Sequence, residues 1–237
     1  MIAGFRLLRY ETLGSTNDEA KRLARDGAAG GTIVWAGEQT AGRGRRGREW
    51  ASPPGNLYMS LLWRPECAVA EAAQLGFVAA LALAEAIHHA ELRFKWPNDL
   101  LLGGKKIAGI LLECETGAEF VVIGMGVNLA SFPGGTETPA TSLVAEGIDR
   151  TPEALLERFA ESFARWETRW REGGFAPIRA AWVLRAGGLG EEIRVRLENT
   201  TLHGRFLDLD EAGALLLGQA GGQRRIAAGD IFPATRR

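Results

Sequence analysis

Short runs of apolar and β-branched residues, bounded by glycine, proline and polar residues, recur along the first half of the chain. Such runs predict strands. The predicted strands cover residues 4–11, 32–36, 56–63, 93–102, 105–113 and 121–128. Gly103-Gly104 separates two of them as a two-residue turn, which predicts a hairpin. Because few helices lie between successive strands, the pattern indicates an α+β fold with a mixed, mainly antiparallel sheet rather than a parallel doubly wound one.

Apolar residues at helical spacing predict the helices that pack on this sheet. The first helix follows a polar triplet in which Thr16 and Glu19 have the form of a capping box. The second is apolar on almost every face and should be buried against the sheet. The predicted helices cover residues 16–27, about 68–90, a segment that opens at Thr151-Pro-Glu153, and about 175–186. The third helix carries a core-facing stripe of Leu155, Phe159, Phe163, Trp166 and Trp170.

The pattern changes after Ala186-Gly-Gly-Leu-Gly190, where short alternating strands begin. They predict a small β-barrel of about fifty residues. The strands lie near 192–198, 201–209, 214–218 and 223–227. Seven Lys and Arg against seven Asp and Glu cancel over residues 191–237, so we interpret the barrel as a protein-contact or substrate-docking module. The sequence therefore predicts two domains, residues 1–187 and 188–237.

Composition narrows the classes of protein that fit. The chain has 237 residues, of which 46% are hydrophobic, with 28 Lys and Arg against 29 Asp and Glu. This balance is ordinary for a soluble globular protein and favours neither a polyanion nor a membrane as partner. Cys67 and Cys114 form no C-x-x-C pair and the three histidines have no metal-ligand spacing, so no protein metal site is expected. Without a signal peptide or a membrane-length apolar run, the expected location is the cytoplasm.

Residues 39–50, Gln-Thr-Ala-Gly-Arg-Gly-Arg-Arg-Gly-Arg-Glu-Trp, form a cationic stretch with a local charge of +3. We name it the arginine loop. Its glycines disfavour both helix and strand, while arginine offers a fork of donors that fits carboxylate and phosphate oxygens. The pattern predicts a mobile lid over an anionic small molecule. An RG-rich nucleic-acid arm and an ordinary solvated loop are the alternatives.

Four segments together resemble the biotin–protein ligase family over about residues 5–185. They are Ser15-Thr16-Asn17, Gln39 with Gly42–Trp50, Lys95-Trp-Pro-Asn-Asp99 leading to Gly104–Gly109, and Gly124-Met-Gly-Val-Asn128. The resemblance implies a class II synthetase-like catalytic domain followed by an SH3-like barrel. The chain resembles the monofunctional members without an N-terminal helix-turn-helix, so DNA binding is not expected. Position 49 departs from the pattern, since Glu49 stands where a basic residue is favoured.

The resemblance implies an ATP-dependent ligase with biotin and ATP as substrates. Biotin and ATP would give biotinyl-5′-AMP and pyrophosphate, and biotin would then pass to a lysine of the biotin carboxyl carrier domain of a biotin-dependent carboxylase. Mg²⁺ would accompany ATP, held by phosphate oxygens and water rather than by a protein cage. Whether the chain forms a homodimer stays open, because any exposed edge strand could pair.

The resemblance also assigns roles to individual residues. Contacts with biotin are implied for Ser15, Thr16, Asn17, Gln39, Arg43, Gly44, Arg45 and Lys106. Contacts with the nucleotide are implied for Arg43, Arg45, Arg46, Arg48, Trp50, Asn98, Lys106 and Asn128. Lys106, Arg45 and Asp99 would be catalytic, with Asp99 either orienting Lys106 or accepting a proton from the acceptor lysine. Trp35 and the strand Ala108-Gly109-Ile110 are candidates for the apolar surface under the biotin bicycle. The residue that stacks on adenine is not identified.

Several of these residues also have a purely structural interpretation. Ser15, Thr16 and Asn17 are common helix caps, Asn98 and Asp99 could form an Asx turn, and Asn128 could be a turn residue. Lys106 could be an exposed hairpin lysine, the role expected of Lys105. A lipoate ligase or octanoyltransferase on the related fold is the nearest alternative function, although it would not need the arginine loop.

Overall fold

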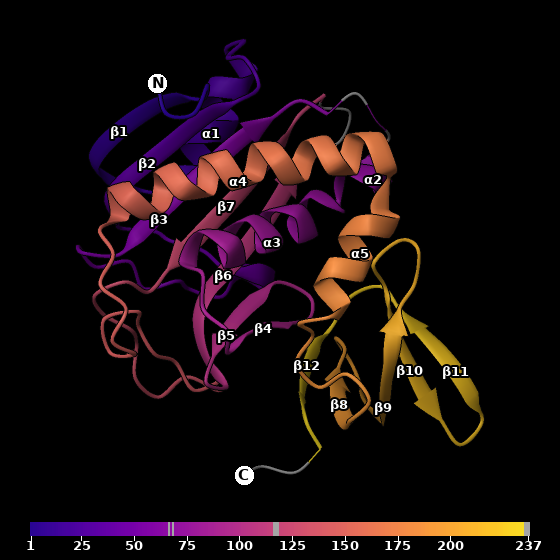
Figure 1. Ribbon diagram of the computed structural model, residues 1–237. Coiled ribbons are helices and arrows are strands. Elements are labelled where there is room, and N and C mark those ends of the chain that lie inside the picture. The colour runs from indigo at the N-terminus through magenta and orange to yellow at the C-terminus, as the bar shows by residue number, and fades with distance from the viewer. Residues whose placement is uncertain (66, 68, 116–118, 235–237) are drawn as a thin grey trace.

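A seven-stranded mixed sheet is the centre of the larger part of the molecule (Figure 1). The computed structural model describes residues 1–65, 67, 69–115 and 119–234. The strands are β1 (Arg6–Leu13), β2 (Thr32–Gln39), β3 (Leu57–Trp63), β4 (Leu92–Lys95), β5 (Asp99–Leu102), β6 (Lys105–Cys114) and β7 (Val121–Val127), in the order β1-β2-β3-β7-β6-β5-β4. β1 and β2 are parallel and the other neighbours are antiparallel, which confirms the predicted sheet type.

Helices cover both faces of this sheet because successive side chains of its strands point to opposite faces, and apolar side chains are found on both. Val34, Leu62 and Val122 pack against the helix α1 (Thr16–Arg25) on one face. Their chain neighbours point to the other face, into the main core with α3 (Leu75–Ile87) and α4 (Pro152–Gly173). We call the two sides the α1 face and the α3 face. Figure 1 shows α4 lying across the α3 face beside α3.

Two predicted helix features differ in the structure. The expected helix at 68–90 is two helices, α2 (Val69–Ala72) and α3, and residue 68 lies outside the described residues. α3 ends before His88, which adopts a left-handed backbone conformation that stops the helix. The capping box is not formed, because the Thr16 side chain bonds elsewhere and Glu19 accepts a hydrogen bond from the Tyr10 hydroxyl at 2.9 Å.

The segment predicted as one strand at 93–102 is two antiparallel strands, β4 and β5, with a turn at 96–98. Pro97 lacks the N–H that a continuous ladder would require. The Gly103-Gly104 hairpin between β5 and β6 is confirmed. A β-bulge at Ile107 shifts the register, so that Lys106 faces Leu101 while Gly109 faces Asp99. The bulge therefore turns both Lys106 and Gly109 toward the α1 face.

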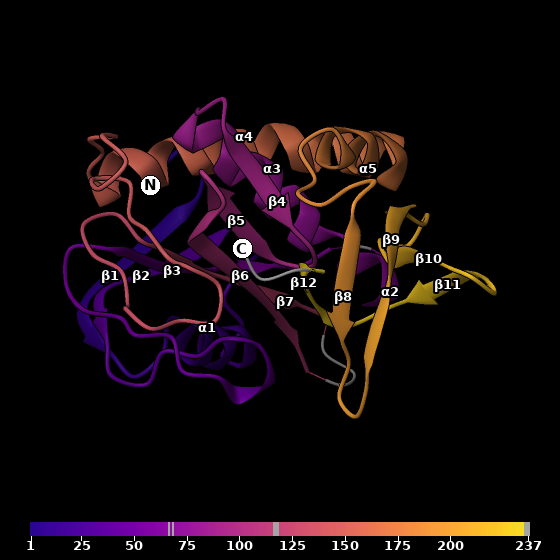
Figure 2. The ribbon, with the colours of Figure 1, turned by 90° about the horizontal axis from the view of Figure 1, so that it is seen from below.

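Five antiparallel strands form a second sheet after α5 (Phe175–Val183), and we call it the C-terminal sheet (Figure 2). Its strands are β8 (Glu192–Arg196), β9 (Thr201–Leu209), β10 (Leu215–Gln219), β11 (Gly222–Ile226) and β12 (Asp230–Pro233), in the order β11-β10-β9-β8-β12. The sequence pattern had missed β12, which has only four residues and opens on a charge. The Trp96 indole N–H donates to the Gly213 carbonyl at 3.1 Å, and one continuous core joins both sheets.

Candidate functional site

A cleft lies on the α1 face of the seven-stranded sheet, beside the apolar contacts of α1, where the strands carry glycines. Gly124 and Gly126 of β7 and Gly109 of β6 form its floor. A Cβ atom on Gly124 would overlap the Asn17 amide, and one on Gly126 would overlap the Trp50 ring. The glycines are therefore needed because other side chains lie directly on the sheet at these positions.

The cleft gathers nearly all of the predicted site residues from segments that are far apart in the chain. Those that line it are Ser15, Thr16, Asn17, Gln39, Arg43, Gly44, Arg45, Arg48, Trp50, Asn98, Asp99, Lys106 and Asn128. Arg46 does not line it, although its guanidinium reaches Asp230 at 3.5 Å. Trp35 lies instead in the core on the α3 face, is 4% exposed and does not line the cleft, whereas Trp50, Gly109 and Ile110 do.

One end of the cleft has a partly buried network of hydroxyl and amide groups, which one carboxylate, that of Glu113, joins from β6. The Thr16 N–H and hydroxyl both donate to Gln39 Oε1, at 2.8 and 3.0 Å, which explains why Thr16 makes no helix cap. The Ser60 hydroxyl lies 2.5 Å from Asn17 Oδ1, and Asn17 Nδ2 donates to Glu113 Oε2 at 2.7 Å. Ser60 and Glu113 were not predicted, because a polar residue inside a strand gives no signal of what it faces. The network holds Thr16, Asn17 and Gln39 in fixed positions in the lining of the cleft.

The arginine loop crosses the cleft as a compact turn. The Trp50 N–H donates to the Gly42 carbonyl at 2.9 Å, and the Gly44 N–H donates to the Arg48 carbonyl at 2.7 Å. Arg43 donates twice to the Asp18 carboxylate of α1, at 2.6 Å each, and this pairing lowers the pKa of Asp18 to about 2. Arg43 is therefore bound to the first turn of α1.

A single carboxylate of the C-terminal sheet, that of Asp230, holds the other arginines of the loop. Asp230 lies 3.2 Å from Arg45, 3.1 Å from Arg48 and 3.5 Å from Arg46. Burial raises the pKa of Asp230, but the arginines outweigh it and bring that pKa below its usual value. Burial also lowers the pKa of the Arg45 guanidinium. Three guanidinium groups around one carboxylate leave an excess of positive charge at this end of the cleft.

Two lysines share Asp99 at the centre of the cleft. Lys106 Nζ lies 2.6 Å from Asp99 Oδ1, and Lys95 Nζ lies 3.8 Å from Asp99 Oδ2. Lys95 also donates to the Thr138 hydroxyl at 2.8 Å, and burial lowers its pKa. Lys105, by contrast, pairs with Glu146 at the surface, as expected of a hairpin lysine. The sequence predicts no individual role for Lys95, because its charge gives no local sign that it shares Asp99 with Lys106.

The two asparagines predicted to contact the nucleotide, Asn98 and Asn128, mainly support the backbone around Lys106. Asn128 is 3% exposed and donates to the carbonyls of Thr141 and Lys106, at 3.0 and 3.4 Å. Asn98 donates to the Ile110 carbonyl at 2.6 Å and accepts from Arg45 at 3.4 Å. Asn128 thus fixes the lysine strand against the segment 139–141, while Asn98 also reaches the arginine loop.

The charges of the cleft suit an anionic ligand that also has a neutral polar part. Cationic groups project from the arginine loop and from β4 and β6, whereas the side chains of Ser15, Thr16, Asn17 and Gln39 that line the far end are uncharged. Among the described residues, no group of three or more His, Cys, Asp or Glu side chains is placed to hold a metal ion. The carboxylates of Asp99 and Asp230 already pair with lysine and arginine side chains, respectively. Within the same described ranges, no helix is long and apolar enough to cross a membrane.

Comparisons with known proteins place these residues in a family context. Residues 11–129 match the model described as "Biotin/lipoate A/B protein ligase family", and residues 188–232 match "Biotin protein ligase C terminal domain". The chain is 47% identical to a biotin–[acetyl-CoA-carboxylase] ligase of Paracoccus denitrificans, over 92% of this chain and 96% of that protein. It is 37% identical to the bifunctional ligase/repressor BirA of Bacillus subtilis, over 97% and 74% respectively.

Solved structures agree with the sequence comparisons. The biotin protein ligase of Aquifex aeolicus in complex with biotin and ATP matches with a TM-score of 0.82 at 28% identity, covering 96% of this chain and 97% of that one. The biotin protein ligase of Leishmania major in complex with biotinyl-5-AMP matches with a TM-score of 0.63 at 26% identity, covering 94% and 99%. Both likenesses extend over the seven-stranded sheet and the C-terminal sheet.

Proposed function

The chain belongs to the biotin/lipoate A/B protein ligase family, and on that premise we propose that it is a biotin–protein ligase. It activates biotin with ATP to biotinyl-5′-AMP and transfers the biotinyl group to a lysine of a biotin carboxyl carrier domain. The observation that carries this proposal is the composition of this cleft, in which a fixed network of hydroxyl and amide groups lies beside two lysines and a cluster of arginines.

The neutral end of the cleft suits the ureido ring of biotin. That ring is uncharged and needs both donors and acceptors, and burying it without partners would cost a few kcal/mol. Thr16, Asn17 and Gln39 supply both kinds of group within a prearranged network, and Ser15 lines the cleft beside them. The bicycle and valeryl chain would lie on Trp50 and the glycine floor. A dithiolane ring offers no equivalent hydrogen bonds, so the network favours biotin over lipoate.

The cationic part of the cleft suits the activation step. A biotin carboxylate oxygen attacks the α-phosphorus of ATP, the bond to the bridging oxygen of the β-phosphate breaks, and pyrophosphate leaves. Two anions must approach one another, so positive groups in a partly buried site lower the barrier. Lys106, held by Asp99 at 2.6 Å, would contact the carboxylate and the α-phosphate. Arg45 and Arg48 would contact the departing phosphates.

Transfer requires a neutral acceptor amine. The lysine nitrogen attacks the carbonyl carbon of the mixed anhydride, AMP leaves, and the amine loses a proton. Since an ordinary lysine is protonated at neutral pH, a base is needed. Asp99 remains our candidate for this base, although its contacts with Lys106 and Lys95 support the orienting role more directly. The closed arginine loop would protect the adenylate from water until transfer.

ATP would bring Mg²⁺ to the site, and the cleft carboxylates determine how that ion could be held. Asp99 is engaged by lysines and Asp230 by arginines. These oxygens therefore do not fit a metal cage, and phosphate oxygens and water would hold the ion.

We further propose that residues 1–187 and 188–237 form two domains and that the protein is cytoplasmic. We also propose that the acceptor carrier domain belongs to a biotin-dependent carboxylase.

Biotin-dependent exchange of labelled pyrophosphate into ATP tests this proposal. We expect exchange with biotin, ATP and Mg²⁺, and none when lipoate or octanoate replaces biotin. Exchange that is faster with lipoate would instead assign the chain to the lipoate branch of the family. A steeply salt-dependent affinity for RNA or DNA, without any pyrophosphate exchange, would instead indicate that the arginine loop binds nucleic acid.

A further inference from the structure

Arg196 of β8 lies behind the wall of the cleft and contacts three residues that line it. Its guanidinium donates twice to the Glu137 carboxylate, at 2.7 and 2.8 Å. It also lies 3.5 Å from Asp230 Oδ2, and its Cζ is 4.8 Å from the Phe232 ring centroid. Glu137, Asp230 and Phe232 all line the cleft, but they belong to two different segments of the chain. One side chain therefore joins a loop of the first sheet to a strand of the second.

The strand register explains how Arg196 reaches these partners. Arg196 is directly opposite Asp230 in the β8–β12 ladder, and Arg194 is opposite Phe232. Their neighbours Ile193, Val195 and Ile231 point into the core. Period-two alternation thus places both arginines, Asp230 and Phe232 on the face of the C-terminal sheet that meets the cleft. Phe232 also meets Lys95, whose Nζ is 4.9 Å from the ring centroid.

The loop that carries Glu137 is firmly held at its two ends. At its start, Asn56 Oδ1 accepts hydrogen bonds from the N–H groups of residues 129, 130 and 131. At its end, the Lys106 N–H donates to the Pro139 carbonyl at 2.7 Å, and the Thr141 N–H donates to the Lys106 carbonyl at 3.0 Å. The middle of the loop, residues 133–138, depends on side-chain contacts, and the bidentate pair of Glu137 with Arg196 links it to the C-terminal sheet.

Glu137 is an acidic residue on the wall of a cleft that must accept polyphosphate. Its partner Arg196 neutralises it and holds it against the C-terminal sheet. Without that partner, a free carboxylate would stand near the phosphates and repel them. Loss of the Arg196 guanidinium would also remove its contacts with the Phe232 ring and with the Asp230 carboxylate.

We propose, on the basis of the function above, that Arg196 is a positioning residue for ATP: it holds the Glu137 carboxylate against the C-terminal sheet and so keeps that negative charge away from the phosphates. It acts through Glu137 and does not itself line the cleft. Its removal should therefore weaken ATP binding and leave both biotin binding and the chemical step unchanged.

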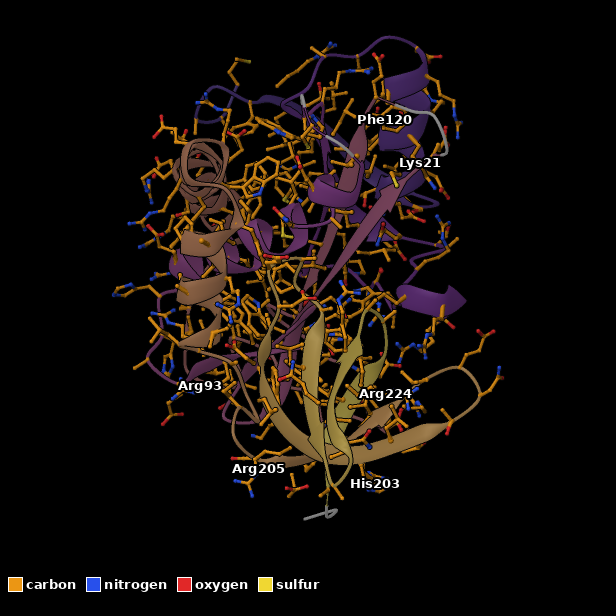
Figure 3. The ribbon with its side chains drawn as sticks, turned by 90° about the vertical axis from the view of Figure 1, so that its right-hand side faces the viewer. Lys21, Arg93, Phe120, His203, Arg205 and Arg224 are labelled. Atoms are coloured by element: carbon orange, nitrogen blue, oxygen red, sulfur yellow. The ribbon has the colours of Figure 1, made fainter. Side chains whose placement is uncertain are left out.

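Steady-state pyrophosphate exchange with four variants tests the proposal. In Arg196→Gln we expect the KM for ATP to rise about fivefold, as for loss of a partly exposed ion pair, while kcat and the KM for biotin stay within twofold. In the double variant Arg196→Gln/Glu137→Gln, which removes both charges, the KM for ATP should return to within twofold of wild type. Glu137→Gln alone should leave it unchanged or lower. Arg205→Gln is the matched control, because Arg205 pairs with Glu192 at the exposed end of the same sheet (Figure 3).

Several outcomes would overturn the proposal. An unchanged KM for ATP in Arg196→Gln, an equal rise in the KM for biotin, or no recovery in the double variant would each contradict it. Hydrogen exchange of the nucleotide-free protein separates a local effect from a folding defect: residues 133–138 should exchange faster in Arg196→Gln than in Arg205→Gln, with the rest of the chain unchanged. Wild-type protein without any exchange activity would refute the proposed function itself, and this inference with it.

Discussion

Replacing Asp18 with asparagine would test how the arginine loop is held over the cleft. Asp18 receives two hydrogen bonds of 2.6 Å from Arg43, and its side chain is 52% exposed. Exposed ion pairs contribute about 0.2–1 kcal/mol, and the bidentate geometry puts this pair near the upper end of that range. A change of about 1 kcal/mol in the closing equilibrium of the loop corresponds to about a fivefold change in the equilibrium constant.

The expected result is a faster loss of biotinyl-5′-AMP. In Asp18→Asn the loop should open about five times more often, so the adenylate should dissociate and hydrolyse about fivefold faster. The measurement preforms the adenylate from labelled biotin and ATP, dilutes the complex rapidly into unlabelled biotin, and follows the label that remains bound. The rate of adenylate formation should change by less than twofold, because Asp18 does not contact the residues around Lys106.

Asp26→Asn is the matched control. Asp26 caps the other end of α1 and pairs with Arg22, away from the cleft. Because Asp18 also lies in the first helical turn, where a negative charge is favourable, the thermal midpoint of each variant should be recorded. The double variant Asp18→Asn/Arg43→Gln should lose the adenylate no faster than Arg43→Gln alone. Additive effects of the two substitutions, or retention of the adenylate in Asp18→Asn at the wild-type level, would refute the role of the Asp18–Arg43 pair in holding the loop.

Three further changes probe other parts of the cleft. Gly126→Ala places a methyl group in the Trp50 ring, so we expect a loss of about 1–3 kcal/mol in unfolding free energy and a raised KM for biotin; Gly76→Ala, which meets open space, should show neither. Lys106→Gln should lower the kcat of pyrophosphate exchange by about 10²–10³ with little change in thermal midpoint, and near-normal kcat would exclude Lys106 from the activation step. The stability that Asp230 contributes should be fully present above its unfolded pKa of about 3.9 and be lost as pH falls through its lower native pKa. Urea unfolding of wild type and Asp230→Asn should therefore converge only below about pH 4, and convergence near pH 6 would contradict this assignment.

Much of the fold follows from short-range patterns in the sequence. The apolar runs of β2, β3 and β7, the Gly103-Gly104 hairpin, and the aromatic stripe of α4 are each set by residues that are close together in the sequence. Local preference was a poor guide where tertiary contacts competed with it. Thr16 bonds to Gln39 instead of capping its helix, and the four-residue strand β12 is defined by its partner β8.

The candidate site divides in the same way. The sequence by itself determined which cationic and polar residues are available, because their order and spacing are local properties of four segments. Only the tertiary structure decided their partners: Asp18 holds Arg43, Asp230 holds Arg45, and the bulge at Ile107 turns Lys106 into the cleft. A carboxylate some 185 residues from its arginine leaves no local pattern. The pairing exists because two sheets pack on a shared core and bring β12 against the arginine loop, and that contact is a property of the folded chain.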